Sequence, residues 1–430
     1  MFVVILNVGF SDTDKCMKKL LYVGPSLFLM LFIMPIKANG QQAKATDKRP
    51  NPFTVGVAYT GELFGNISGG VNTGVRYLDN IDVDLTIDLE PLVGVPDSKL
   101  FFYGLGNQGG SISGLVGDVQ GISNIEAENS WRLYEAWIEQ IFPRTNTSLL
   151  LGLYDLNSEF DVNQTGALFI NSSHGIGPEF GISGVLGPSI FPYTSLGGRL
   201  KVNPLKGLTL KAAVLDGIPS DPADTEGTNI FIRENDGALL SAEVSYTSGE
   251  NQLEPSNRHN FLVRGAGPLN QYRFVVGGWL YTRPRRGWIE DDQRDQGLYA
   301  TVETRLYSEE ADAAQGLAGF VRLGLANGKI NRFSGYTGAG LVYTGLFNKR
   351  SEDQAGLAVA VPWSSPDYQA VVETPNLSPA DYEMNVEVTY RFVFSSNIQF
   401  QLDAQYVINP NTLLNNDNAF LAGTRLLLSL

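Results

Sequence analysis

Few residues in this sequence have the types and spacing that covalent chemistry requires. Residues Gly104–Gly109 have the glycine spacing of a dinucleotide-binding loop, and they follow a predicted strand. Such a loop holds a pyrophosphate at the N-terminus of a following helix, and no amphipathic helix follows this one. The sequence also lacks a Gly-x-Ser-x-Gly elbow, a Walker loop and a His-Glu-x-x-His motif. We therefore predict no catalytic residues.

The histidines and acidic residues likewise do not suggest a metal site. The sequence contains two histidines, His174 and His259, which argues against a histidine-ligated metal. Asp82, Asp84 and Asp88 lack the glycine of a calcium-binding loop. Their even spacing instead places them on one face of a strand. We predict no metal and no cofactor.

Composition limits the elements that can position the remaining polar residues. Of the 430 residues, 43% are hydrophobic and 18% are charged, which excludes a disordered chain. The formal net charge is −14 at pH 7, whereas nucleic-acid binding needs clustered Lys and Arg. We therefore expect an ordered chain with no nucleic-acid partner.

The N-terminal 40 residues have the pattern of a secretory signal peptide preceded by upstream residues. Met17–Lys19 is followed by an apolar run over 20–36, and Ala38–Gly40 offers small residues for cleavage. A membrane helix is the alternative, but the run is short and contains two prolines. We expect translation to start at Met17 and cleavage near Gly40. The only cysteine, Cys16, would then lie outside the mature chain.

Segments of about ten residues with alternating polarity recur beyond residue 50. Clear examples are Ile81–Glu90, 384–394 and 398–406. A strand half-buried in a soluble sandwich would alternate in the same way. Strands of this length behind a secretion signal instead favour a transmembrane β-barrel, with lipid outside and water inside. The apolar residues that should face lipid include Val386, Phe392, Phe400 and Leu402.

The number of alternating segments predicts the size of the barrel. Seventeen segments begin near Phe53, Val75, Lys99, Trp131, Ser148, Thr194, Gly207, Gly237, Arg258, Gln271, Gln296, Leu317, Gly338, Ala355, Glu383, Asn397 and Ala419. Single-chain bacterial barrels have even strand numbers, so we assign the weakest segment, Arg258–Gly267, to a turn. The sequence thus predicts an all-β, 16-stranded antiparallel transmembrane barrel over 53–430. Residues 41–52 form a short preceding segment, and 1–40 form the targeting region.

The linkers between the predicted strands differ in length at the two ends of the barrel. If the first strand runs outward, the periplasmic linkers are those around 91–97, 143–147, 203–206, 348–354 and 395–396, and the long outer linkers are 108–130, 156–193, 216–236, 283–294 and 364–382. Short periplasmic turns and long outer loops are typical of bacterial barrels. The longest linker, 156–193, has about 38 residues, a length that usually serves a function. We predict that it folds into the lumen; the alternative is a lid over the mouth.

Several segments resemble the carbohydrate-selective porins of the OprB type. These segments are Gly117–Glu126, Gly152–Asp161, Leu168–Pro178, Gly187–Pro192, Ala213–Gly217 and Gln405–Pro410. The resemblance spans roughly residues 53–430. It implies a sixteen-stranded barrel in the outer membrane of a Gram-negative bacterium, through which sugars such as glucose diffuse. The final Leu430 departs from the aromatic residue usual in such barrels, and Arg258–Asn270 looks like an insertion.

The resemblance also implies a passive sugar channel whose selectivity arises where outer loops enter the lumen. A constriction that favours neutral polyols should offer hydrogen-bond donors and acceptors together with aromatic faces. Candidate residues in or near the family-like segments are Glu126, Trp131, Arg132, Glu135, Trp137, Asp155, Asn157, Glu159, Asp161, Asn171, His174 and Arg199. Each of them could instead only anchor a loop.

Two other functions stay open on the sequence alone. The acid excess favours a general cation-preferring diffusion porin, with Asp82, Asp84 and Asp88 facing the lumen. A barrel-scaffold outer-membrane enzyme is the other alternative, although no nucleophile–base pair is visible. The expected partners are small sugars, outer-membrane lipid and lipopolysaccharide, and the barrel-assembly machinery, with the chain either a monomer or a homo-oligomer.

Overall fold

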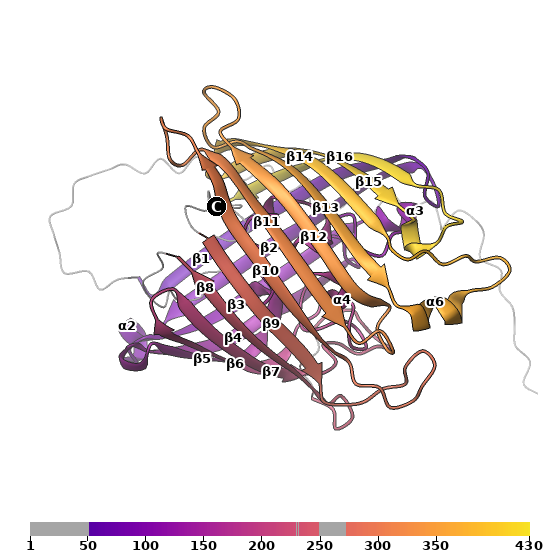
Figure 1. Cartoon of the computed structure of the whole chain (residues 1–430). Coiled ribbons are helices and arrows are strands. Elements are labelled where there is room, and N and C mark those ends of the chain that lie inside the picture. Colours follow the sequence, from indigo (N-terminus) through magenta and orange to yellow (C-terminus); the bar gives the residue numbers. More distant parts are fainter. Residues whose placement is uncertain (1–50, 229, 231, 249–271) are drawn as a thin grey trace, which may run out of the picture. The chain divides into compact units, whose positions relative to one another are not determined.

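The computed structural model describes residues 51–228, 230, 232–248 and 272–430, which form an antiparallel β-barrel (Figure 1). Within this part of the chain, sixteen strands pair in sequence order, and β1 pairs with β16 to close the barrel. The strands are β1 (Phe53–Ser68), β2 (Gly74–Asp88), β3 (Ser98–Gly109), β4 (Ser130–Phe142), β5 (Thr147–Tyr154), β6 (Ser195–Leu205), β7 (Leu208–Asp216), β8 (Ala238–Thr247), β9 (Tyr272–Tyr281), β10 (Gln296–Ser308), β11 (Gly316–Ala326), β12 (Phe333–Thr344), β13 (Gln354–Ser364), β14 (Met384–Ser395), β15 (Ile398–Ile408) and β16 (Ala419–Ser429). The predicted fold class is confirmed.

The strand starts follow the alternating segments of the sequence. Apart from β12, each strand begins within one residue of its predicted start. β12 begins at Phe333 rather than at Gly338, because its register shifts between Phe333 and Gly335 and because its early glycines carry no polarity signal. β8 pairs directly with β9, so no strand lies between them in the sheet. Arg258–Gly267, the signal peptide, its cleavage site and Cys16 all lie outside the described residues.

The barrel wall is apolar on its outer face and polar on its inner face. On β14 and β15, Val388 is 54% exposed and Leu402 is 45% exposed, whereas the inward Glu387 and Gln401 are buried. Burying so many polar groups would be costly unless they were hydrogen-bonded, and exposing so much apolar surface is stable only in contact with lipid. This arrangement matches the predicted lipid-facing side of these strands.

Exposed aromatic side chains mark both ends of the apolar outer face. Phe142, Tyr272 and Phe394 lie near the end with the short turns, and Trp131 and Trp363 lie near the opposite end. Aromatic girdles at the two membrane–water interfaces are typical of outer-membrane barrels. The segment of the barrel between these two aromatic girdles therefore spans the membrane.

The helices are short and lie in the connections. They are α2 (Glu90–Val93), α3 (Ser113–Val116), α4 (Pro178–Gly181) and α6 (Pro366–Val372), with 3₁₀ helices η3 (Pro143–Thr145), η4 (Leu156–Ser158), η5 (Gly166–Leu168), η6 (Ser172–His174) and η7 (Pro410–Thr412). Among the described residues, no helix has the length and hydropathy needed to cross a membrane. Figure 1 shows α2 at one end of the barrel and α3 and α6 at the other, in line with the predicted alternation of linkers.

The acidic face predicted on the second strand extends less far than expected. Asp82 and Asp84 point inward and are buried. Asp88 is exposed at the end of β2, where its carboxylate accepts a hydrogen bond from the N–H of Glu90, the first residue of α2. The strand ends there because Pro91 cannot continue a β-ladder. Asp88 therefore belongs to the rim of the barrel rather than to its lumen.

Candidate constriction site in the barrel lumen

Two outer connections enter the barrel and form the site: the β3–β4 loop (110–129) and the β5–β6 loop (155–194). Local hydrogen bonds shape the β5–β6 loop. The Asp155 side chain accepts from the Asn157 N–H at 2.9 Å and caps η4, and the Asn171 side chain accepts from the Ser173 N–H at 3.1 Å and caps η6. Short polar side chains favour such turns because they replace the missing helical partners of the backbone. The loop is thus folded, as its polar content predicted.

A buried ion-pair triad fixes the β5–β6 loop to the far wall. Arg322 on β11 donates from Nε and Nη2 to the two carboxylate oxygens of Asp161 at 2.8 and 2.5 Å. Its Nη2 also donates to Glu179 at 2.8 Å. Burial raises the pKa of Asp161 to about 6, opposed by the Arg322 guanidinium. Buried charges need such partners, so the triad holds two separate points of the loop against one strand.

Glutamates on the inner wall bind the backbone of the same loop. The Asp161 N–H donates to Glu243, the Thr165 N–H to Glu303, and the Ile170 and Asn171 N–H groups to Glu387, at 2.6–3.0 Å. A carboxylate that accepts a backbone N–H makes a strong, charge-assisted hydrogen bond. The loop is therefore held along β8, β10 and β14, and it covers that side of the lumen.

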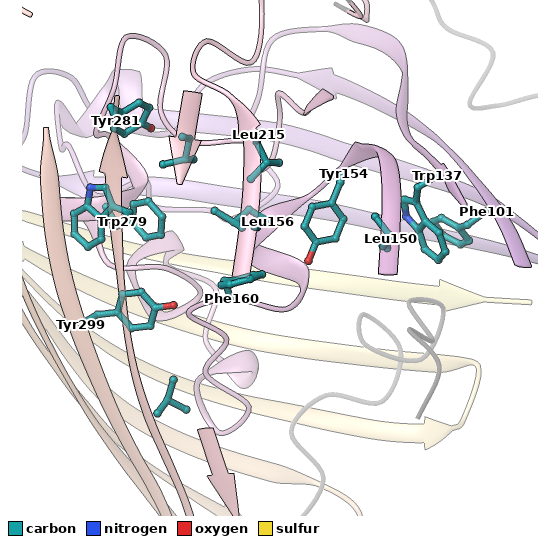
Figure 2. Packing of buried hydrophobic residues seen from close by; sticks show 14 residues of the cluster. Phe101, Trp137, Leu150, Tyr154, Leu156, Phe160, Leu215, Trp279, Tyr281 and Tyr299 are labelled. Atoms are coloured by element: carbon teal, nitrogen blue, oxygen red, sulfur yellow. The ribbon is translucent and has the colours of Figure 1, made fainter. Parts of the chain in front are cut away.

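Apolar contacts beneath the loop complete its anchoring. Phe160 and Phe180 of the loop are fully buried, and the Phe180 ring stacks on Trp279 of β9 at 4.2 Å. Figure 2 shows this cluster, with Trp137 against Phe101 at one end and Trp279 near Tyr281 at the other. Fully burying a large apolar side chain stabilises a fold by about 1.5–3 kcal/mol. Hydrophobic packing and ion pairs thus act together on the β5–β6 loop.

The β3–β4 loop binds the β5–β6 loop and the barrel wall. The Asn124 N–H donates to the Ile170 carbonyl at 2.9 Å, and the Ser172 N–H donates to the Gly121 carbonyl at 3.0 Å. Glu383, which precedes β14, accepts from the backbone N–H groups of the β3–β4 loop at residues 119 and 120. Burial and the neighbouring Asp118 carboxyl raise the pKa of Glu383 to about 8. The two loops therefore form one connected constriction.

Beside these loops lies a luminal cavity of about 600 Å³. Its walls come from β1–β4, β6 and β14–β16 on one side and from the two loops on the other. Charged side chains on the lining are Asp155, Glu159, Lys201, Arg391 and Arg425, amides include Asn80, Gln120, Asn124, Asn157, Asn163, Gln399 and Gln401, and aromatic rings are Tyr103, Tyr134, Phe169 and Phe191. This lining offers donors, acceptors and ring faces within one volume.

Three of the four aromatic residues on the lining form a continuous row. The Tyr103 and Tyr134 rings meet edge to face at 5.1 Å, and Tyr134 meets Phe191 at 6.5 Å. Most of the charged residues on the lining are paired: Glu159 accepts from Arg199 at 2.6 Å, and Lys201 lies 3.3 Å from the same carboxylate. The site can therefore contact apolar sugar faces and hydroxyl groups without exposing many unpaired charges.

Of the residues predicted from the sequence, Asp155, Asn157 and Glu159 border the cavity. Most of the others hold the loops. Asp161 belongs to the triad, Glu126 accepts from the Ile112 and Ser113 N–H groups, and Arg132 donates to the Pro192 carbonyl. Glu135 accepts from the Asp155 N–H, and Asn171 donates to Gln405. Arg199 joins Glu139 to Glu159. These residues support the constriction from behind.

His174 and Trp137 are buried away from the cavity. His174 packs against Phe169 at 4.9 Å, and burial lowers its pKa to about 3, so the imidazole is neutral. Its 3.9 Å approach to Glu387 is therefore not an ion pair. Trp137 stacks on Phe101 at 4.8 Å. Both side chains serve packing.

Trp131 lies on the outer face of β4 and not in the lumen. It is 56% exposed, as is typical of the outward side, while Trp137 on the same strand points inward. The pairing of β3 with β4 shifts between Tyr103 and Gly104, which adds one residue to β4 near Tyr134. A bulge of this kind reverses the side on which all following residues lie. Trp131 therefore faces outward, although Trp137, six positions along the same strand, faces the lumen.

Residues that are not among the predicted site residues also border the cavity. Lys201, Arg391, Gln401 and Arg425 border it, together with Tyr103. The alternation had already placed Arg391 and Gln401 on the polar face of their strands. The alternation of polarity does not show which part of the polar face the two loops leave uncovered.

The family comparison accords with this geometry. Residues 72–430 match the family model described as carbohydrate-selective porin, OprB family. This chain belongs to that family. A porin of this family is a channel of the Gram-negative outer membrane, so the carbohydrate-selective class and the location expected from the sequence are confirmed.

Individual relatives of this OprB-family porin are distant in sequence. Porin B of Pseudomonas aeruginosa PAO1 is 24% identical over 416 residues, which covers 89% of this chain and 88% of that protein. The high-pH structure of Pseudomonas putida OprB has a TM-score of 0.73 at 19% identity and covers 88% of this chain and 94% of its own. The outer-membrane channel DcaP of Acinetobacter baumannii has a TM-score of 0.50 at 12% identity, covering 88% and 97% of the two chains. These structures share the barrel fold.

Proposed function

We propose that this porin lets small neutral sugars such as glucose diffuse passively through its lumen, with no catalytic step. The observation that carries the proposal is the lining of the cavity, where amides and hydroxyls surround a row of aromatic rings. A sugar presents hydroxyl groups around its edge and C–H groups on its faces. Amide side chains can replace the hydration of the hydroxyls while the rings contact the faces.

The pairing of the charged side chains favours a channel for neutral solutes over a general cation-preferring porin. Glu159 is held by Arg199 and Lys201, and Glu62 is held by Arg425 at 2.5 Å. Asp82 accepts hydrogen bonds from its neighbours Asn80 and Tyr103 within the wall. Paired charges order the water in a constriction but give little net attraction for a free cation.

The test is swelling of liposomes that contain the full chain. Glucose and a zwitterionic amino acid of matched size would be compared at the same osmolarity. The proposal predicts faster swelling with the sugar than with the amino acid. Equal rates for the two solutes would support a general diffusion porin instead, and empty liposomes provide the control for leakage.

A further inference from the structure

Arg391 on β14 is a buried cation on the cavity lining that lacks a carboxylate partner. It is 8% exposed, and its Nη2 donates to the side-chain amide oxygen of Gln354. In the described part of the chain it forms no ion pair, and its Nε–H, which is buried, has no acceptor. A buried guanidinium without a counter-charge is costly, so its charge must be matched from the side that is open, which is the cavity.

The register of the last strands builds a polar row around this guanidinium. Arg391 lies directly opposite Gln401 on β15, and Gln401 lies opposite Arg425 on β16. Neighbouring strands are about 4.8 Å apart, so the two arginines are about 10 Å apart on one wall. Gln399 borders the cavity beside them. The Gln401 amide already donates both of its N–H groups, to the Leu168 carbonyl at 2.8 Å and to the Thr389 hydroxyl at 2.7 Å. A small anion between the arginines would therefore be bound by the guanidinium groups.

The charges around the row leave one positive charge in excess. Arg425 is already neutralised by Glu62, to which it donates from Nε at 2.5 Å, and it also donates to Asn124 at 2.6 Å. On the inward face of β14 and β15, Asp403 lies one inward position from this row and Glu387 lies two, and these two carboxyl groups hydrogen-bond each other. A single uncompensated guanidinium matches one carboxylate, whereas a doubly charged phosphate would need a second free cation.

We propose that Arg391, with Gln399 and Arg425, binds the carboxylate of an acidic sugar, so that the channel admits hexuronates in preference to basic sugars of the same size. This inference rests on the proposed sugar channel and adds a charge preference to it. The preference is opposite to the one that the net charge of −14 suggests, because the lining of the cavity carries three cations and two carboxylates.

The test compares uptake of labelled glucose, glucuronate and glucosamine into proteoliposomes at low solute concentration and low salt. These three solutes share one ring and differ in charge. The wild-type chain should admit glucuronate faster than glucosamine, and glucuronate should inhibit glucose uptake at lower concentration than glucosamine does. Arg391→Gln should lower the ratio of glucuronate to glucose flux about tenfold, the value of one charge-assisted hydrogen bond, and Arg391→Lys should retain most of the ratio.

The control is Arg286→Gln, which removes a charge from a side chain that is 88% exposed in an outer loop and should leave all three fluxes unchanged. Normal glucose flux with equal entry of the two charged sugars would overturn this inference and leave the proposed function standing. Loss of preferential glucose entry in the wild-type chain would overturn both. The wild-type competition needs no variant, so it decides the matter even if Arg391→Gln assembles poorly.

Discussion

Replacing Arg322 by Met should release the β5–β6 loop while the barrel stays closed. The change leaves Asp161 and Glu179, each 1% exposed, without their shared counter-charge. Removing one partner of a buried ion pair costs about 3–5 kcal/mol. The sixteen-strand ladder does not depend on this group, so the cost falls on loop docking, and the population of undocked loop should rise about 10²- to 5 × 10³-fold.

The assay is single-channel conductance combined with chymotrypsin digestion, because Phe180 is fully buried in the docked loop. Arg322→Met should give larger and noisier currents and cleavage within the loop. The triple variant Arg322→Met, Asp161→Asn, Glu179→Gln should recover much of the docking, since the penalty comes from unpaired charge. Arg286→Met is the control, because its partner Asp291 and Arg286 itself are both exposed. Unchanged conductance and protease resistance in Arg322→Met would refute the assigned role of the triad.

Three further outcomes are expected. Leu402→Arg should cost about 2–4 kcal/mol in urea unfolding from lipid vesicles and Leu402→Met under about 1.5 kcal/mol, and equal stability of the two variants would contradict the lipid-facing assignment. The folded-state pKa of His174, about 3, lies below the ordinary histidine value of 6.5. The neutral buried imidazole therefore contributes its full stability above pH 6.5, and up to about 5 kcal/mol of stability is lost as the pH falls toward 3. His174→Leu should flatten this pH dependence in urea midpoints measured between pH 4 and 7. Replacing Asp82 and Asp84 by Asn should shift the reversal potential only slightly toward chloride at 0.1 M salt, where the screening length is about 10 Å, because both carboxylates are buried in the wall, and it should leave glucose uptake within about twofold.

The sequence predicts the barrel well because strand alternation is a local signal. Each alternating stretch, such as Ile81–Asp88, shows which side chains face lipid without reference to the rest of the chain. The exceptions are also local. A bulge near Tyr134 and the glycines at the start of β12 change or hide the alternation, and no residue type marks them uniquely.

The site is harder to predict because it depends on contacts between distant residues. Asp161 and Arg322 are separated by 161 positions, and only the docked loop brings them together. Family-like segments therefore identified residues that hold the loops, such as Glu126, Asp161 and Asn171, as well as residues that border the cavity. Arg391 and Arg425 come from strands with ordinary alternation, and their importance arises from the part of the wall that the loops leave open.

The central claim is that the two inward loops and the last strands make a sugar-selective constriction. The most direct measurement is the ratio of glucose to zwitterion permeability in liposomes, compared between the wild-type chain and a variant that lacks Gly166–Gly187. If the two loops make the constriction, the deletion should raise conductance and bring the ratio close to one. A deletion variant that assembles as a barrel and keeps the wild-type ratio would contradict this claim.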